Sequence, residues 1–185
     1  MSNLLLQPDL SGGSPIHDVT PASAGWSHVG FGLHDLTAGG SVESGGTADE
    51  ICLVLLSGSV RIIADDLDTG LLQGRASVFD KVAPHAVYVP MKTAWRVEAG
   101  SDSELAVCRA PGTEGKLPPR LIGSQNMPLE TRGTGSNVRH VCNILPETEP
   151  ADSLLVVEVI TPAGNWSSYP PHKHDTDNLP EESYL

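Results

Sequence analysis

Two histidines one residue apart, near the end of the sequence, form the pattern with the clearest chemical meaning. His172 and His174 stand in the segment PPHKHD, directly after two prolines. Side chains alternate along an extended chain, so both imidazoles would project to one face and Lys173 to the other. Imidazole together with carboxylate is a ligand set that suits zinc, manganese, iron or nickel. Carboxylates follow closely, at Asp175, Asp177, Glu181 and Glu182. The pattern indicates a divalent metal site, with two solvated histidines in a turn as the alternative.

Short β-strands are the elements that would position these histidines. The chain has 185 residues, of which 19 are glycine and 15 are proline, and this content leaves little room for long helices. Runs of strand length and strand composition occur at 28–36, 51–63, 85–90, 94–99, 104–110, 137–145 and 153–162. Residues 57–59 and 99–103 are short glycine-containing connections, and each predicts a β-hairpin. The run 153–160 is apolar almost throughout, which predicts a strand buried on both faces. The fold class predicted from these runs is all-β.

Composition divides the chain into an arm, a first β-domain, a connection and the beginning of a second β-domain. Residues 1–24 are rich in proline, glycine and serine and are expected to form a loosely packed arm. The first domain is expected over 25–112, followed by a connection over 113–136 that is dense in proline and glycine. Strand character resumes over 137–185, where the second domain is expected to begin but not to finish.

Charge and cysteine usage narrow the functional class. The formal net charge is −12, which excludes nucleic acid and anionic membrane surfaces as partners, because both need clustered Lys and Arg. No apolar run approaches the length of a membrane span, and the N-terminus lacks a signal peptide. The cysteines Cys52, Cys108 and Cys142 are odd in number and lie in apolar runs. They predict buried free thiols in a cytoplasmic protein.

The second half of the sequence resembles a known enzyme family. The HxH pair resembles the first metal motif of the cupin superfamily, although Asn178 and Leu179 stand where a cupin places its glutamate. The segments RGTGSNVRHVCNIL, LLVVEVITPAGNWSSYPPHKHD and DNLPEESYL together resemble the 5-deoxy-glucuronate isomerase family of bacterial myo-inositol catabolism. The match is close from residue 132 to residue 185 and more diffuse before it. That two-cupin family is related to 5-keto-4-deoxyuronate isomerase.

The resemblance implies a fold, a reaction and a metal. The fold would be a cupin, a double-stranded β-helix or jelly-roll barrel, with one complete N-terminal cupin and the opening strands of a second. The reaction would be aldose–ketose isomerisation of 5-deoxy-glucuronate to 5-dehydro-2-deoxy-gluconate, assisted by a divalent metal, with zinc or manganese expected. His172 and His174 match the family's first two metal ligands, whereas the third would follow Leu185. We therefore expect the 185-residue chain by itself to hold metal weakly or not at all and to be inactive.

Other polar residues are weaker candidates. Glu50 is placed like a cupin glutamate but has no HxH before it, so the first domain is expected to be free of metal. Arg139 could pair the carboxylate of a sugar-acid substrate, with an ordinary ion pair as the alternative. Trp166 could stack on a sugar ring or simply be buried. His34 and His85 are expected to pack or to form hydrogen bonds rather than bind metal.

Two further function classes remain open, and the chain is expected to self-associate. One alternative is a non-catalytic cupin-like module that binds a sugar, and the other is an Fe(II) cupin oxygenase. An apolar strand over 153–160 without covering strands would favour association with another chain. We expect a homo-oligomer, a dimer or larger, whose partner otherwise is a small-molecule sugar acid.

Overall fold

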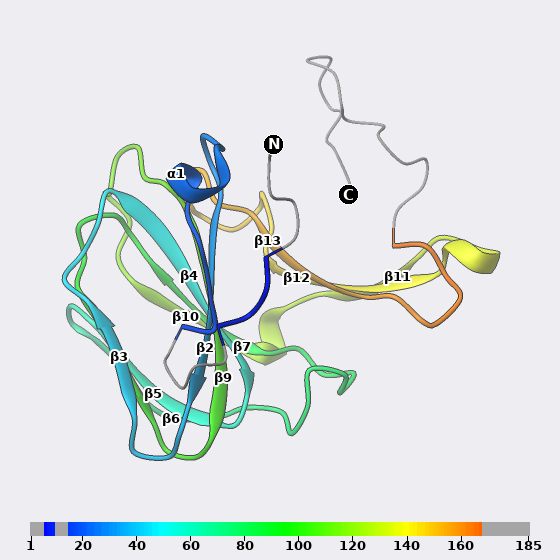
Figure 1. Ribbon diagram of the computed structural model, residues 1–185, viewed down its shortest axis with the longest axis horizontal. Helices are drawn as coiled ribbons and strands as arrows, with labels where there is room; N and C mark the ends of the chain where they lie inside the picture. The colour runs from blue at the N-terminus through cyan, green and yellow to red at the C-terminus, as the bar shows by residue number, and fades with distance from the viewer. Residues whose placement is uncertain (1–5, 10–14, 168–185) are drawn as a thin grey trace. The chain divides into compact units, whose positions relative to one another are not determined.

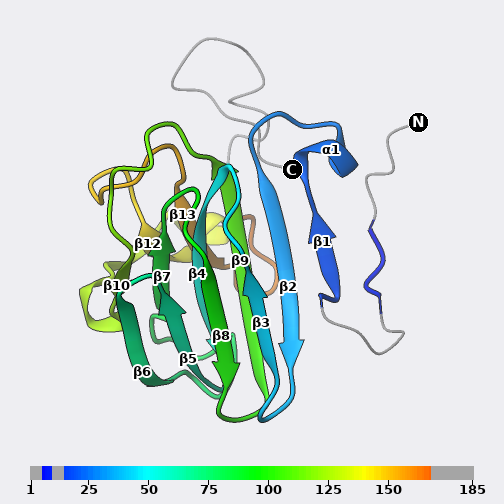
Figure 2. The same ribbon diagram turned by 90° about the vertical axis from the view of Figure 1, so that its left-hand side faces the viewer.

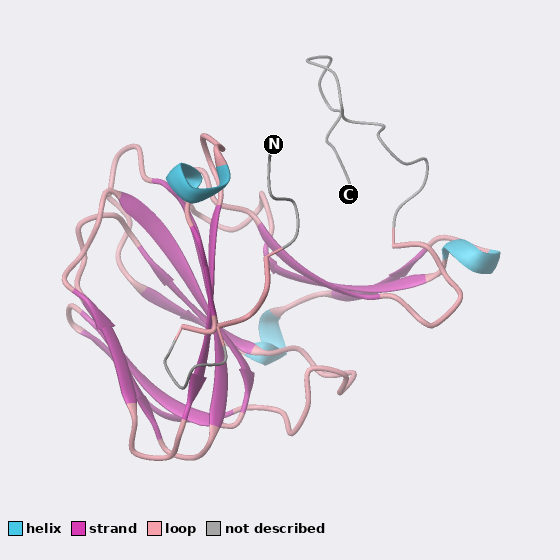
Figure 3. Ribbon diagram, in the orientation of Figure 1, coloured by secondary structure: helices cyan, strands magenta, loops and turns pink. Residues whose placement is uncertain are grey.

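The structure, a computed structural model, describes residues 6–9 and 15–167. Within this part of the chain the regular structure is almost all strand, as Figure 3 shows. The α-helix of the described part is the single turn α1 (Pro21–Ala24), which Thr20 caps by accepting a hydrogen bond from the amide of Ser23. Two 3₁₀ turns, Ser124–Asn126 and Gly135–Asn137, complete the helical structure described. The all-β prediction is confirmed.

Two antiparallel sheets form the first compact unit, which comprises the chain up to Met127 together with Ile144–Val156. The six-stranded sheet has the order β1 (His17–Val19), β2 (Gly30–Leu36), β9 (Ser103–Pro111), β4 (Asp49–Ser57), β7 (His85–Val89) and β10 (Arg120–Ile122). The four-stranded sheet has the order β3 (Ser41–Ser44), β8 (Trp95–Ala99), β5 (Ser59–Ala64) and β6 (Leu67–Gln73). In Figure 1, β3, β5 and β6 lie to the left and β2, β7 and β9 to the right, and Figure 2 gives the view at right angles. This double-sheet barrel is the cupin architecture that the resemblance implied.

The core lies between the two sheets and follows from the alternation of side chains along each strand. In β5, for example, Val60, Ile62 and Ala64 are buried whereas Arg61 between them is exposed. The core residues share an inward position on one of the two sheets: Leu36, Ile51, Leu53, Leu55, Val60, Ile62, Ala64, Leu72, Val87, Val89, Trp95, Val97, Ala99, Leu105 and Val107. The burial of this apolar face is what holds the sheets together.

Neither predicted hairpin exists, because both connections are corners where the chain crosses from one sheet to the other. At Gly58 the chain leaves β4 in the six-stranded sheet and enters β5 in the four-stranded sheet. At residues 100–102 it crosses back from β8 to β9. The corners bind each other, since the amide of Ser59 donates to Oγ of Ser103 (3.0 Å) and the amide of Gly100 donates to the carbonyl of Ser59 (2.8 Å). The two strands that flank each corner both turn an apolar face to the core. Both faces can be buried at once because the two strands lie in opposite sheets, which pack face to face.

The predicted arm and connection both contribute strands to this unit. Within residues 1–24, β1 pairs with β2 in the register His17↔Leu33, so the arm packs at its end rather than lying loose. Within residues 113–136, β10 pairs with β7 at the opposite edge of the same sheet. These strands are only three residues long, which is too short to produce a recognisable alternation in the sequence.

The three-stranded sheet β11 (Leu129–Arg132), β12 (Arg139–Leu145) and β13 (Val156–Ile160) belongs mainly to the second compact unit, Pro128–Asn143 with the residues from Val157 onward. The run 153–160 was predicted to be buried on both faces, and this is wrong for the described residues. Leu155, Val157 and Val159 are each exposed by more than 40%. The strand also starts at Val156 rather than at Ser153, because residues 152–154 bind a side chain of β4 as described below.

No helix in residues 6–9 and 15–167 is long and apolar enough to cross a membrane.

Candidate functional site

The predicted metal ligands His172 and His174 lie outside the residues that the structure describes. The same holds for the four acidic residues that follow them in the sequence. Among the described residues, no group of three or more His, Cys, Asp and Glu side chains could hold a metal ion. The candidate site is therefore built from Arg139 and Trp166, the two residues predicted to contact a sugar-acid substrate that the structure does describe, and from the residues around them.

Arg139 and His140 begin β12, the middle strand of the three-stranded sheet. Nη1 of Arg139 donates to the carbonyl of Asn137 at 3.1 Å, and no carboxylate forms an ion pair with this guanidinium among the described residues. The ordinary ion pair that was the alternative expectation for Arg139 is thus not found among the described residues. Nδ1 of His140 lies 3.1 Å from the hydroxyl oxygen of Thr131 on β11, which fixes the orientation of the ring.

A loop and a tryptophan lie at the same end of β12. The amide of Trp166 donates to the carbonyl of Ser136 at 2.8 Å, and Nδ2 of Asn165 donates to the carbonyl of Val138 at 2.9 Å. The side chain of Trp166 is 66% exposed, so simple burial does not explain it. Oδ1 of Asn137 is buried and accepts no hydrogen bond from the described residues. The hydrogen bonds between residues 136–138 and residues 165–166 therefore bring together a guanidinium and an unused amide oxygen from one segment and an exposed indole from the other.

Glu50 of the first unit is fully buried and serves as an anchor for the chain. Its Oε2 accepts hydrogen bonds from the hydroxyl of Tyr88 and the amide of Asp152, both at 2.8 Å. Its Oε1 accepts from the amides of Ser153 and Leu154 at 2.5 Å, and from Oγ of Ser153 at 3.0 Å. Burial, followed by the hydrogen bond to Glu50, raises the pKa of Tyr88 well above its ordinary value. With both oxygens occupied in this way, Glu50 is a structural carboxylate rather than a metal ligand.

Asp152 repeats the arrangement one step further along the chain. Its Oδ2 accepts three backbone hydrogen bonds, from the amides of Thr113, Glu114 and Gly115 at 2.9–3.0 Å. These hydrogen bonds lower the pKa of the Asp152 carboxyl, and the bond from the amide of Gly115 has the largest effect. On the same side of the sheet, Arg120 lies over the ring of Tyr88 at 4.6 Å. Sequence reasoning did not identify this network, and the one signal for it was a carboxylate, Glu50, at the head of an otherwise apolar run.

The two histidines that were expected to pack or to form hydrogen bonds are both in the first unit. Nδ1 of His85 accepts a hydrogen bond from the amide of Ser124 at 3.4 Å. His34 on β2 is 5% exposed, and burial followed by the nearby Arg109 guanidinium lowers its pKa. Cys52, Cys108 and Cys142 form no disulfide with one another, as predicted; Cys52 and Cys142 are also buried as predicted, whereas Cys108 is only partly buried.

Comparison with known proteins assigns the chain to a family. The model of the KduI/IolB family matches residues 4–185. The chain is 53% identical over 167 residues to the 5-deoxy-glucuronate isomerase of Geobacillus kaustophilus (strain HTA426), which covers 90% of this chain and 60% of that protein. It is 42% identical over 190 residues to the protein of the same name from Bacillus subtilis (strain 168), covering 100% of this chain and 70% of that protein.

A solved structure agrees with these sequence matches. An IolB-like protein from Salmonella typhimurium LT2 superimposes with a TM-score of 0.91 at 45% sequence identity, over 98% of this chain and 68% of that one. The chain thus spans about 60% of the length of the Geobacillus relative and about two thirds of the length of the solved structure. The family match extends over the cupin sandwich, the three-stranded sheet and the HxH segment, and the chain belongs to the KduI/IolB family.

Proposed function

We propose that this protein acts as an isomerase that converts 5-deoxy-glucuronate to 5-dehydro-2-deoxy-gluconate, an intramolecular transfer of hydrogen from C2 to C1. The observation that carries the proposal is the 53% identity to a protein named 5-deoxy-glucuronate isomerase over 90% of this chain. The IolB-like structure, at 45% identity, supports it. Cytoplasmic action on a small sugar acid is part of the same proposal, consistent with three free thiols and a net charge of −12.

A divalent metal belongs to the proposal, with zinc or manganese as the expected ion. His172 and His174 would hold it, and neutral imidazoles in the HxH spacing fit such an ion. The described residues contribute no three-ligand group, so they supply at most part of its coordination. When bound, the metal would polarise the C1 carbonyl of the open-chain sugar.

Arg139 is the residue of this chain that we propose to bind the substrate's carboxylate. Its guanidinium makes one hydrogen bond, through Nη1, to protein groups of the described part. The remaining N–H groups suit a carboxylate, which an arginine can bind in bidentate fashion. Trp166 is placed on the loop beside it and is exposed, as a sugar-stacking residue would need to be.

The test uses histidine variants of the protein. His172→Ala and His174→Ala should each lose most of the bound metal, measured by elemental analysis, and reduce isomerase activity by about 100-fold or more, measured by NMR of the C1 aldehyde. Lys173→Ala is the matched control and should keep both, because residue 173 projects to the opposite face. Equal losses in all three variants would contradict the HxH assignment. Activity that requires dioxygen would instead support an Fe(II) oxygenase, and the absence of any turnover a sugar-binding module.

Self-association is the last part of the proposal. Val157 and Val159 alternate along one face of β13 and are both exposed, which favours burial against a second copy of the chain. Light scattering should give the mass of a dimer or larger. A monomer at tens of micromolar protein would contradict this part alone.

A further inference from the structure

The inner face of three strands at one edge of the six-stranded sheet carries a group of charged and imidazole side chains beside the apolar core. The register places Asp18 of β1 opposite Gly32 of β2, and Gly32 opposite Val107 of β9. His34 and Arg109 are each two residues away from a member of this row, so all these side chains share one face. Because Val107 belongs to the core, this face is turned toward the interior of the sandwich.

The guanidinium of Arg109 reaches across two glycines to meet Asp18. Its Nη1 donates to Oδ1 of Asp18 at 2.8 Å. A Cβ built on Gly30 would lie 3.4 Å from Cβ of Arg109, and one built on Gly32 would lie 3.2 Å from Nη2 of Arg109. The same Cβ on Gly32 would lie 3.5 Å from Nε2 of His34. The absence of a side chain at Gly32 is therefore what brings the polar ends of Arg109 and His34 to one place.

The ion pair between Arg109 and Asp18 leaves one donor group and one acceptor atom without a hydrogen-bond partner among the described residues. Among the described residues, Nη2 of Arg109 and Oδ2 of Asp18 take part in no hydrogen bond. The side chains of Arg109 and Asp18 are 21% and 48% exposed, so solutes can reach the pair from solvent, whereas His34 beside it is buried. Donors and acceptors in a small polar group on an apolar wall are the usual composition of a small-molecule site.

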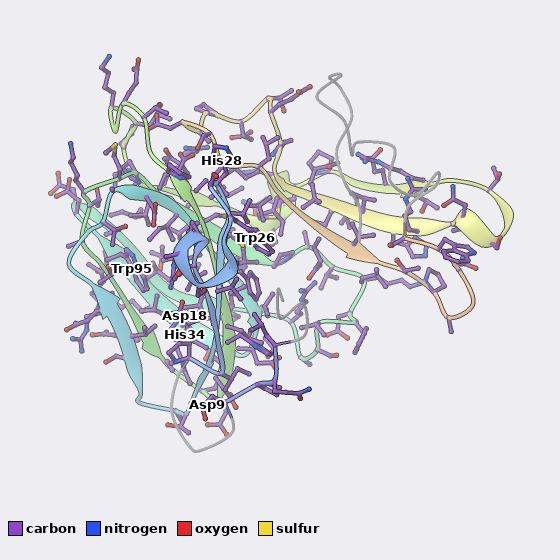
Figure 4. All side chains as sticks on the ribbon, turned by 45° about the horizontal axis from the view of Figure 1, so that its top comes forward. Asp9, Asp18, Trp26, His28, His34 and Trp95 are labelled. Atoms are coloured by element: carbon purple, nitrogen blue, oxygen red, sulfur yellow. The ribbon has the colours of Figure 1, made fainter. Side chains whose placement is uncertain are left out.

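A second, independent observation comes from the opposite sheet. Trp95 is 6% exposed, and its indole N–H, at Nε1, has no hydrogen-bond partner among the described residues. The amide of Lys92 donates to the carbonyl of Thr47, and this bond brings the start of β8 to the end of the sandwich where β4 begins. Ile51 of β4 pairs with Arg109 at that same end. In Figure 4, Trp95 is labelled to the left of Asp18 and His34, as expected for a residue of the four-stranded sheet. A buried indole N–H without an acceptor calls for one, and a ligand oxygen would supply it.

The charges decide which ligand class fits. Arg109 and Asp18 cancel, and burial favours the neutral form of His34. An anion entering this group would gain little net attraction, and the net charge of −12 would oppose it. Hydroxyl groups, in contrast, can donate to a carboxylate and accept from a guanidinium or an indole. We propose that the interior of the first cupin, at Asp18, His34, Arg109 and Trp95, is a binding site for a small neutral polyhydroxylated compound, separate from the HxH site.

The test is binding of a defined panel to the chain carrying His172→Ala and His174→Ala, which removes any contribution from the proposed metal site. The probes are glucose and xylitol as neutral polyols and glucuronate as a sugar acid. Calorimetry should show saturable binding of at least one neutral polyol and weaker binding of glucuronate. The ¹H–¹⁵N resonance of the Trp95 indole, assigned with Trp95→Phe, should shift on binding. Because the histidines are absent, the outcome is independent of the proposed isomerase activity.

Two variants locate the site, each with a matched control. Gly32→Ala places a methyl group between the Arg109 and His34 ends and should weaken binding roughly tenfold or more, whereas Gly45→Ala adds the same methyl group in open space and should not. Arg109→Gln should weaken binding similarly, and Arg96→Gln, which removes an arginine with exposed ion pairs on another strand, should not. The absence of binding by both neutral polyols, an unshifted Trp95 resonance, binding that survives both site variants, or tighter binding of glucuronate would each overturn the proposal.

Discussion

Replacing Glu50 should break the contact between β4 and residues 152–154. Glu50→Gln preserves the size of the side chain but replaces one accepting oxygen with an NH₂ donor. Five protein hydrogen bonds end on the carboxylate, from Tyr88, Asp152, Leu154 and twice from Ser153. In the Gln variant the NH₂ group would therefore face N–H or O–H donors at the position of at least one former oxygen.

The magnitude follows from the donors that would lose their acceptor. The side chain of Tyr88 is fully buried, and the hydrogen bond from Leu154 to Glu50 is also buried. A buried donor left without a partner costs about 1–3 kcal/mol. We therefore expect Glu50→Gln to lower the free energy of unfolding by about 2–3 kcal/mol, and Glu50→Ala by about 3–5 kcal/mol. These are large fractions of the roughly 5–15 kcal/mol that stabilises a domain.

Urea unfolding followed by far-UV circular dichroism gives the global effect. Amide hydrogen exchange gives the local one, since the amides of residues 152–154 should exchange slowly in the wild type and rapidly in the variants. Glu43→Gln is the control, because Glu43 is exposed in a surface ion pair with Arg96, and it should change stability by less than about 1 kcal/mol. An effect of Glu50→Gln below 0.5 kcal/mol, or unchanged exchange at residues 152–154, would refute the anchoring role.

Three further outcomes follow from the same geometry. Asp152→Asn should lower the urea midpoint at pH 6, and the difference in midpoint from the wild type should shrink below a pH of about 3.8. The reason is that a carboxyl whose pKa is lowered by folding stabilises the protein only while it is ionised. A constant difference in midpoint down to pH 2 would contradict this. Gly58→Ala should lower the free energy of unfolding in urea by more than about 3 kcal/mol, since its Cβ would lie 2.2 Å from a carbonyl oxygen. Gly39→Ala, also at positive φ but in open space, should lower it by about 1–2 kcal/mol. Equal losses in the two variants would be inconsistent with crowding at the corner. Cys52 and Cys108 should react slowly with a disulfide reagent at pH 8 in the native protein and quickly in urea, because burial raises both pKa values, that of Cys108 to about 11; rapid native modification of either thiol would show that they are accessible.

The sequence alone predicted the features that depend on short-range patterns. Runs of strand length and strand composition, such as 51–63 and 94–99, indicated the strands, and the glycine and proline content excluded long helices. The free thiols followed from an odd cysteine number and apolar neighbours. The HxH pair and the segments around it led to the family that the comparisons support, because those segments contain their signal in consecutive residues.

Only the tertiary structure decided which strands pair and which polar groups meet. Periodicity states which face of a strand is buried but not against what, so the connections at Gly58 and Gly100 were predicted as hairpins although each crosses between sheets. Glu50 binds the chain a hundred residues further on, and Arg109 meets Asp18 across 91 residues. No local rule links positions so far apart, because the contacts form only when both sheets have packed and the loss of chain entropy is balanced by burial of the whole core.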